Sequence, residues 1–196
     1  MFKQFKIACM MLLSFTILTG LIYPVLIAGI GQLVFPWQAQ GSLFSYQGSV
    51  VGSQYIGQWF QQPRYFLGRP SATAQISYNA LYSGASNLAP SNPVLVDIVR
   101  WRVRQWQQLD PNNVQPIPIE LVTASASGLD PEITPRAAFY QVPRVARLNH
   151  LSEKKLQNLI DKMVLPRTFG ILGEPRVNVL ALNMALDRIV STEKDN

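Results

Sequence analysis

The residues best suited to enzymatic chemistry are two serines, one aspartate and the single histidine of the chain. A serine nucleophile, a histidine base and a carboxylate that orients the histidine form a hydrolytic triad, which would combine Ser125 or Ser127 with His150 and Asp130. The two serines lie in a small-residue stretch instead of the GxSxG turn that presents a nucleophile, however, and His150 falls at the end of a predicted helix. We therefore interpret Asp130 and the proline after it as a turn, and keep a serine hydrolase as an alternative.

Other common catalytic and metal-binding patterns are missing from the sequence. The single cysteine, Cys9, excludes a disulfide within the chain and a zinc site built on cysteines, and the single histidine excludes an HExxH metal site. The sequence also has no Walker A motif and no GxGxxG motif. We therefore expect no catalytic residues and no metal ligands.

A basic and aromatic cluster around Arg100, Arg102 and Arg104 is the strongest hint of a polyanion site. The chain carries 17 basic and 11 acidic residues, and this net charge of +6 invites a nucleic-acid interpretation. Two of the basic residues, Lys3 and Lys6, precede an apolar segment, and the arginines fall on a predicted helix with a clear apolar face. We therefore expect no nucleic-acid partner, and keep a module that binds an anionic envelope polymer as a second alternative.

An uncharged stretch over residues 7–30 predicts a membrane-spanning helix. It is dominated by apolar residues and exceeds the roughly 20 residues that cross the hydrocarbon core. Pro24 removes one backbone donor, which a membrane helix tolerates as a kink. A cleavable signal peptide is disfavoured because its apolar core has about 7–15 residues, and because neither Ala28 nor Ala39 fits a small-x-small cleavage pattern. We expect a retained anchor in which Gly20 and Ala28 let other helices approach closely.

The lysines before this helix predict its orientation. Lys3 and Lys6 flank its N-terminal end, whereas no Lys or Arg lies near its C-terminal end. The positive-inside rule then places residues 1–6 in the cytoplasm and residues 31–196 outside the membrane, which in a bacterium means the periplasm. In this topology the alternative hydrolase would be a membrane-anchored periplasmic enzyme.

Residues 31–196 predict one mixed domain with more helix than strand. Small strands or a hairpin are expected within residues 38–57, and another short strand is expected over residues 117–123. Between them, the many Pro, Gly and Ser residues of the segment 61–93 predict a long ordered loop. The fold class is therefore α+β, with one N-terminal transmembrane helix followed by a single extracytoplasmic domain.

Capping residues and apolar periodicity predict four helices in this domain. The expected N-caps are Ser91 or Asn92 for the first helix, Thr134 for the second, Ser152 for the third and Asn178 for the last. Pro143 is expected to kink or break the second helix. The expected buried face of the first helix consists of Val94, Leu95, Ile98, Val99, Val103 and Trp106.

Four blocks of sequence carry a family resemblance. They are Gly57-Gln58-x-Phe60-x-x-Pro63-x-Tyr65-Phe66-x-Gly68-Arg69-Pro70-Ser71, then Thr123-Ala-Ser-x-Ser127-Gly128-Leu129-Asp130, then Gln141-x-x-Arg144-Val145-Ala146, and last Gly173-Glu174-Pro175-x-Val177-Asn178-Val179-Leu180-x-Leu182-Asn183-x-Ala185-Leu186-Asp187. In this order, behind a lone N-terminal anchor, the chain resembles the C subunit (KdpC) of the bacterial potassium-transporting P-type ATPase. The resemblance spans essentially the whole chain.

This resemblance implies a non-catalytic accessory subunit of an ATP-driven, high-affinity potassium importer in the bacterial inner membrane. The implied partners are a channel-like potassium-binding subunit, an ATP-hydrolysing P-type subunit and a small single-span subunit. ATP and K⁺ would be substrates of the complex, with no cofactor bound firmly by this chain. The role implied is that of a catalytic chaperone, which assembles the complex and raises the ATP affinity of the hydrolysing subunit.

The resemblance also implies candidate site residues. A segment that has been connected with nucleotide in this family corresponds to Ser83, Gly84, Ser86 and Asn87, with Ala85 where the family often has glycine. Direct nucleotide contact conflicts with a domain outside the cytoplasm, so we expect indirect coupling. The candidate partner contacts are Gly20, Ala28, Arg69, Ser127, Asp130, Arg144 and Asn178.

Overall fold

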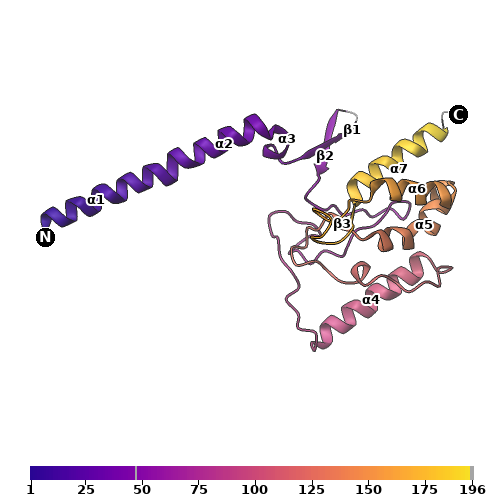
Figure 1. Cartoon of the computed structure of the whole chain (residues 1–196). Coiled ribbons are helices and arrows are strands. Elements are labelled where there is room, and N and C mark those ends of the chain that lie inside the picture. Colours follow the sequence, from indigo (N-terminus) through magenta and orange to yellow (C-terminus); the bar gives the residue numbers. More distant parts are fainter. Residues whose placement is uncertain (47, 195–196) are drawn as a thin grey trace. The chain divides into compact units, whose positions relative to one another are not determined.

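The computed structural model describes residues 1–46 and 48–194, which divide into two compact units (Figure 1). The first unit, Met1–Leu43, is helical, and the second, Phe44–Asn196, contains the mixed α+β domain. Helix predominates over strand, so the predicted fold class is confirmed.

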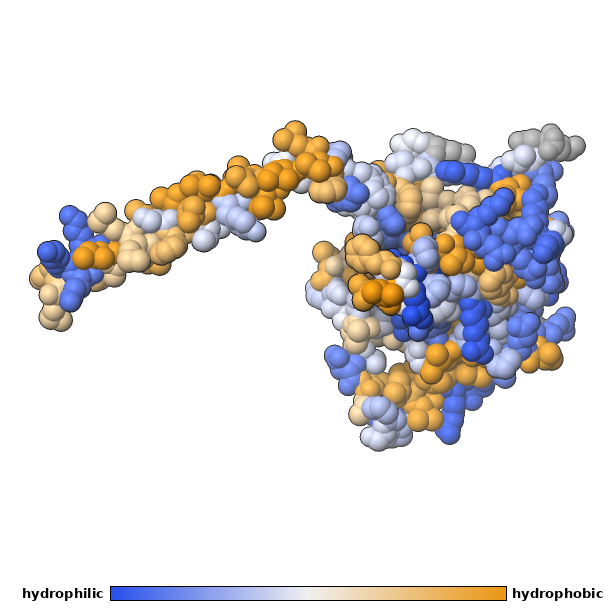
Figure 2. All heavy atoms as spheres, in the orientation of Figure 1, coloured by the Kyte–Doolittle hydropathy of each residue, from blue (hydrophilic) through white to orange (hydrophobic). Residues whose placement is uncertain are grey.

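The first unit is a continuous helical run over Phe2–Val34. It consists of α1 (Phe2–Ile17), a π-helical turn (Leu18–Ile22) and α2 (Tyr23–Val34), and the short α3 (Pro36–Ala39) follows it. At about 1.5 Å per residue the run is long enough to cross a bilayer, and its mean hydropathy reaches 2.1. Figure 2 shows apolar atoms along it and hydrophilic atoms at its N-terminal end. Among the described residues, it is the one helix that is long and apolar enough to span a membrane.

The irregularity expected at Pro24 takes the form of the π-helical turn just before it. A proline inside a helix lacks an N–H donor, and its ring crowds the carbonyl group four residues earlier. A π-helical turn widens the backbone at that position, which here is occupied by Gly20. The hydroxyl group of Thr19 donates to the carbonyl oxygen of Phe15 at 2.7 Å, so this polar side chain is satisfied within the helix.

The second unit begins with the predicted hairpin. Strand β1 (Leu43–Tyr46) pairs with β2 (Ser49–Ser53), whereas Tyr55 and Ile56 lie in a turn. From residue 54 to residue 92 the chain has no helix and no strand, as the abundance of Pro, Gly and Ser predicts.

The first helix of the domain, α4 (Pro93–Leu109), begins at Asn92, whose side chain accepts a hydrogen bond from the amide of Val94. Its predicted buried face is wrong in part: Trp106 is buried, but Val94 is 52% exposed. The indole of Trp106 and an ion pair at 2.8 Å between Asp110, just after α4, and Arg147 of α5 fix the C-terminal end of α4 to the domain. The first turn of α4 is therefore more exposed than predicted, whereas Val99 and Val103 pack against the core.

The strand predicted over residues 117–123 is wrong. The structure has a 3₁₀ turn at Ile119–Leu121 instead. Pro116 and Pro118 lack the N–H groups that a strand needs for its ladder, and the hydroxyl group of Thr123 donates back to the carbonyl oxygen of Ile119. Local hydrogen bonds thus replace strand pairing here.

Three further helices begin at the predicted caps. They are α5 (Pro135–Asn149) after Thr134, α6 (Glu153–Met163) after Ser152 and α7 (Val179–Lys194) after Asn178. Contacts join α5 to α6 and α6 to α7, and the three lie together in Figure 1. Their inner faces form the core together with Ile133, Val177 and other buried residues.

Pro143 does not break α5, which runs through it. An interior proline costs about 3 kcal/mol. Burying a large aliphatic side chain stabilises by about 1.5–3 kcal/mol, and Val142 and Val145 on either side of Pro143 are both fully buried. The burial of this helix face therefore offsets the missing hydrogen bond.

Two short strands were not predicted. Strand β3 (Glu132–Ile133) pairs antiparallel with β4 (Val177–Asn178). Each strand has two residues, too few for a sequence pattern, and their partners lie far apart in the chain. The pair joins the end of the second block to the start of α7.

Buried polar side chains hold the first block in place where strand pairing is missing. The side-chain amide of Asn183 in α7 bonds to both the N–H and the C=O of Phe66, each at 2.9 Å. The amide of Gln141 in α5 does the same for Leu67, at 2.8 and 3.0 Å. Arg144 donates to two more carbonyl oxygens of this segment. The helices thereby supply hydrogen-bond partners to buried backbone groups of the loop. Without these partners, the buried groups would lower the stability of the fold.

Candidate functional site

The first and second blocks meet at an ion pair between Arg69 and Asp130. The guanidinium Nη1 of Arg69 lies 2.9 Å from Oδ2 of Asp130, and both side chains are about three-quarters buried. The other oxygen of Asp130 accepts from the amide of Glu132 at 3.0 Å, which is a side-chain turn across Pro131, whereas the helix that follows is capped by Thr134. The amide of Gly57 donates to the carbonyl oxygen of Leu129 at 2.8 Å, so backbone contacts reinforce this junction.

The hydroxyl group of Ser71 makes the next connection between the two blocks. It donates to the carbonyl oxygen of Gly128 at 2.7 Å and accepts from the amide of Tyr78 at 2.8 Å. Gly128 has φ +67°, and a Cβ there would lie 2.7 Å from the carbonyl oxygen of Gly84. Only glycine fits this close approach without moving the backbone.

The segment that the resemblance connected with nucleotide lies against the second block. The hydroxyl group of Ser83 and the amide of Gly84 both donate to the carbonyl oxygen of Ser127, at 3.1 and 2.8 Å. Ser86 and Asn87 are exposed. The structure therefore brings Ser83 and Gly84 together with Ser127, and it uses the amide of Gly84 internally.

Tyr78 lies close to the ion pair of Arg69 and Asp130. Its hydroxyl group donates to the carbonyl oxygen of Arg69 at 2.5 Å. Burial, and to a smaller extent the negative charge of Asp130, raises the pKa of Tyr78 to about 12. A Cβ on Gly57 would lie 2.4 Å from the Tyr78 ring, so the first block needs glycine where the ring packs.

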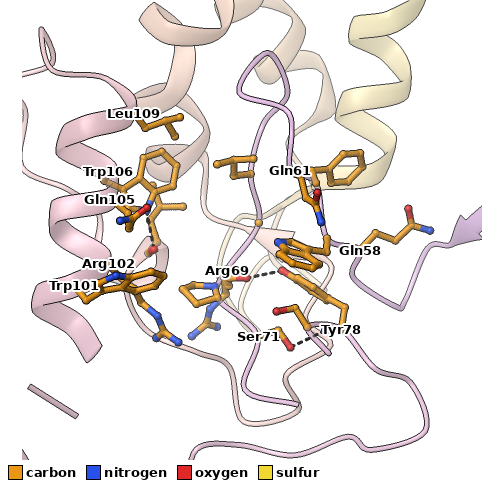
Figure 3. A pocket seen from close by; sticks show the side chains of 17 residues that line it. Gln58, Gln61, Arg69, Ser71, Tyr78, Trp101, Arg102, Gln105, Trp106 and Leu109 are labelled. Atoms are coloured by element: carbon orange, nitrogen blue, oxygen red, sulfur yellow. Dashed lines mark hydrogen bonds between the residues drawn. The ribbon is translucent and has the colours of Figure 1, made fainter. Parts of the chain in front are cut away.

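A groove of about 610 Å³ lies between α4 and the first block. Trp101, Arg102 and Trp106 lie on the α4 wall, and Arg69 lies on the opposite wall (Figure 3). Trp59 also lines the groove. Figure 3 shows the guanidinium groups of both arginines in the space between these walls. The remaining lining residues are Gln58, Phe60, Gln61, Leu67, Gly68, Pro70, Ser71, Ser77, Tyr78, Gln105, Leu109 and Leu121.

A second hollow, of about 520 Å³, is also lined by Arg69. Ser127 and Asp130 line it together with Arg69, so three of the predicted contact residues share one surface. The polar groups here are engaged within the chain, because Arg69 and Asp130 pair with each other and the hydroxyl group of Ser127 accepts from the amide of Leu129.

Comparison with known proteins identifies the family. Residues 5–188 match the family described as "K+-transporting ATPase, c chain". The chain belongs to this family. It is 53% identical over 189 residues to the potassium-transporting ATPase KdpC subunit of Methylococcus capsulatus, covering 96% of this chain and 100% of the relative. It is 51% identical to that of Herpetosiphon aurantiacus (96% and 98% covered) and 54% identical to that of Methylibium petroleiphilum (93% and 95% covered).

Membership of the KdpC family confirms the resemblance carried by the four blocks. Members are subunits of a potassium-transporting ATPase, and the single apolar helix over Phe2–Val34 fits a single-pass membrane subunit. The chain is accordingly an accessory subunit and not the ATP-hydrolysing one.

The residues of the alternative hydrolase do not form a triad. Ser125 and Ser127 accept hydrogen bonds from backbone amides of their own loop. His150 ends α5 in a left-handed conformation and is exposed, and among the described residues no hydrogen bond joins it to either serine or to Asp130.

The basic cluster on α4 does not form one polyanion surface either. Arg102 is half-buried and donates to the carbonyl oxygen of Val122 at 3.0 Å, and its burial lowers its pKa. Arg100 pairs loosely with Asp97 at 3.4 Å at the surface, and Arg104 is exposed. The three arginines thus lie in different environments.

Two predicted contact residues lie inside the domain. Arg144 is 0% exposed, and burial lowers its pKa to about 10. Asn178 is 4% exposed; its side chain caps α7 and donates to the carbonyl oxygen of Gln54 at 2.7 Å. Both side chains serve the fold. Gly20 and Ala28 lie on the membrane helix, and a Cβ on Gly20 would meet no atom of the chain within 4 Å.

Sequence reasoning missed the groove. Its walls come from α4 and from a loop about 40 residues earlier, and no periodicity connects them. One signal was present: Trp101 is a large apolar residue outside the expected buried face of α4.

Proposed function

We propose that this chain is a non-catalytic assembly and coupling subunit of a potassium-importing ATPase in the bacterial inner membrane. It would join the channel-like subunit, the ATP-hydrolysing subunit and a small single-span subunit. One observation carries the proposal: the polar residues of the four blocks form hydrogen bonds to the chain's own backbone, as Asn183 does to Phe66. They do not form a catalytic site. ATP and K⁺ would be substrates of the complex, with no firmly bound cofactor here.

The membrane helix supplies the first contact with the partners. It has no buried residue within this chain, and the small residues Gly20 and Ala28 would allow close packing against neighbouring helices. Cysteine crosslinking from these two positions tests this point. Crosslinks to the other subunits are expected, and a helix that crosslinks to none of them would be a lone span.

Lys3 and Lys6 favour a cytoplasmic N-terminus, with residues 31–196 in the periplasm. A reporter fused after the C-terminus tests this topology: alkaline phosphatase should be active and a cytoplasmic fluorescent protein dark. The opposite pattern would reverse the orientation.

We propose that the effect on ATP affinity is indirect. Binding of this chain to one conformation of the pump would shift the population toward the form that binds ATP well. Couplings of this kind typically amount to about 5–150-fold in affinity. The internal use of the Gly84 amide supports this view, because that amide donates to Ser127 and is not free for a phosphate.

An ATP titration of the purified complex tests the coupling. With this chain present, the KM for ATP should be at least about 5-fold lower than in a complex assembled without it. Equal KM and equal turnover in the two preparations would refute the chaperone role.

A further inference from the structure

The groove between α4 and the first block contains a cation without a counter-ion. The Arg102 guanidinium has one recorded hydrogen bond, to the carbonyl oxygen of Val122. None of the ion pairs among the described residues includes it, whereas Arg69 opposite is paired with Asp130. An arginine stays charged at neutral pH even when partly buried. The groove therefore offers a half-desolvated positive charge to a ligand.

Two indole rings border the same groove and are poorly covered. Trp101 is 55% exposed and Trp59 is 59% exposed, and both line the cavity. Tryptophan and arginine are the residue types that most often dominate the energy of protein interfaces. A tryptophan buries a large apolar area when a partner covers it, so these rings offer apolar contact area to a ligand in the groove.

We infer that this groove binds a polypeptide segment of another subunit, one that carries a carboxylate for Arg102 and an apolar side chain for the indole rings. The planar guanidinium can bind a carboxylate through two parallel hydrogen bonds. The inference rests on the proposed function, because it assumes that the chain works inside a complex.

A nucleotide would also bring negative charge and a flat ring, and a guanidinium group can bind a phosphate, but the groove lacks the magnesium ligands and the glycine-rich turn of common nucleotide sites. Its lining includes no lysine and no carboxylate that could hold Mg²⁺. It also lacks a glycine-rich turn of the P-loop kind, since Gly68 is its single glycine. A carboxylate needs only the guanidinium that is present.

Photo-crosslinking in the complete complex tests the inference. A p-benzoylphenylalanine substitution at Trp101 is introduced into the full chain, the complex is purified and irradiated, and the crosslinked peptide is sequenced. We expect a segment of another subunit that contains Asp or Glu. The same photo-reactive residue at Arg104, exposed on the same helix but outside the groove, should not label that segment.

Arg102→Gln and Arg104→Gln form a matched pair. We expect Arg102→Gln to increase the rate at which this chain dissociates from the immobilised complex about ten-fold or more, because the partner's carboxylate is left unpaired. Arg104→Gln should change this rate little. Unfolding temperatures check that both variants fold. If Arg102→Gln is unstable, Arg102→Lys retains the charge without the planar fork and should show a smaller acceleration.

Three results would overturn the inference: a crosslink to lipid, no crosslink at Trp101 in a complex that contains the chain, or displacement of the crosslink by ATP. Each of these results is compatible with a chain that still assembles with the other subunits, so none of them refutes the proposed function. Failure of the unmodified chain to co-purify with other subunits would instead refute the proposed function.

Discussion

Replacing Asn183 by leucine should destabilise the domain severely, although leucine is of similar size. Asn183 is 1% exposed, and its amide is bonded to the N–H and the C=O of Phe66. Leucine leaves both backbone groups buried without partners, at about 1–3 kcal/mol each, which makes about 2–6 kcal/mol in total. A domain has roughly 5–15 kcal/mol of stability, so this loss takes a large share of it.

The assay is thermal unfolding of the full chain in detergent, followed by near-ultraviolet circular dichroism of its tryptophans. For a domain of this size we expect Asn183→Leu to lower Tm by about 5–20 °C. Asn158→Leu is the matched control, because Asn158 is exposed on α6 and surface changes are usually within about 0.5 kcal/mol. If Asn183→Leu melts within the error of this control, the amide does not hold the first block as argued.

Two further changes probe the junction of the first two blocks. Gly128→Ala should lower Tm more than Gly173→Ala, because both have positive φ but only the first would place a Cβ 2.7 Å from Gly84; equal losses in parallel melts would refute the close approach. Tyr78→Phe should cost about 1 kcal/mol near neutral pH by losing its hydrogen bond to Arg69. Because the pKa of Tyr78 is raised from 10.0 to about 12, its contribution is complete below pH 10 and is lost as the pH rises toward 12. Chemical denaturation at a series of pH values should therefore show that the free energy of unfolding falls more steeply above pH 10 for the wild type than for Tyr78→Phe. The same dependence on pH in both proteins would contradict the burial of the phenol.

Local signals predicted the helix starts well. Asn92, Thr134, Ser152 and Asn178 all cap helices, because a capping side chain bonds to amides two or three residues ahead and needs no distant partner. The membrane helix was predicted for the same reason, since its signal is a continuous run of apolar residues.

Features that depend on distant partners escaped sequence reasoning. The break expected at Pro143 failed because the buried face of α5 outweighs the local cost, and the pairing of β3 with β4 joins residues far apart in the chain. The candidate site also combines features that the sequence indicates with features that depend on distant contacts. Arg69, Ser127 and Asp130 were selected through the resemblance, but their meeting, and the groove that Arg102 lines, follow from the tertiary structure.

The central claim is that this chain works as a bound subunit and not alone. The most direct measurement is mild detergent extraction of membranes from cells that express the tagged chain, followed by identification and quantification of the proteins that co-purify. The account predicts the channel-like and ATP-hydrolysing subunits in near-equal amounts with this chain. Recovery of the chain by itself, with those subunits present in the same membranes, would contradict it.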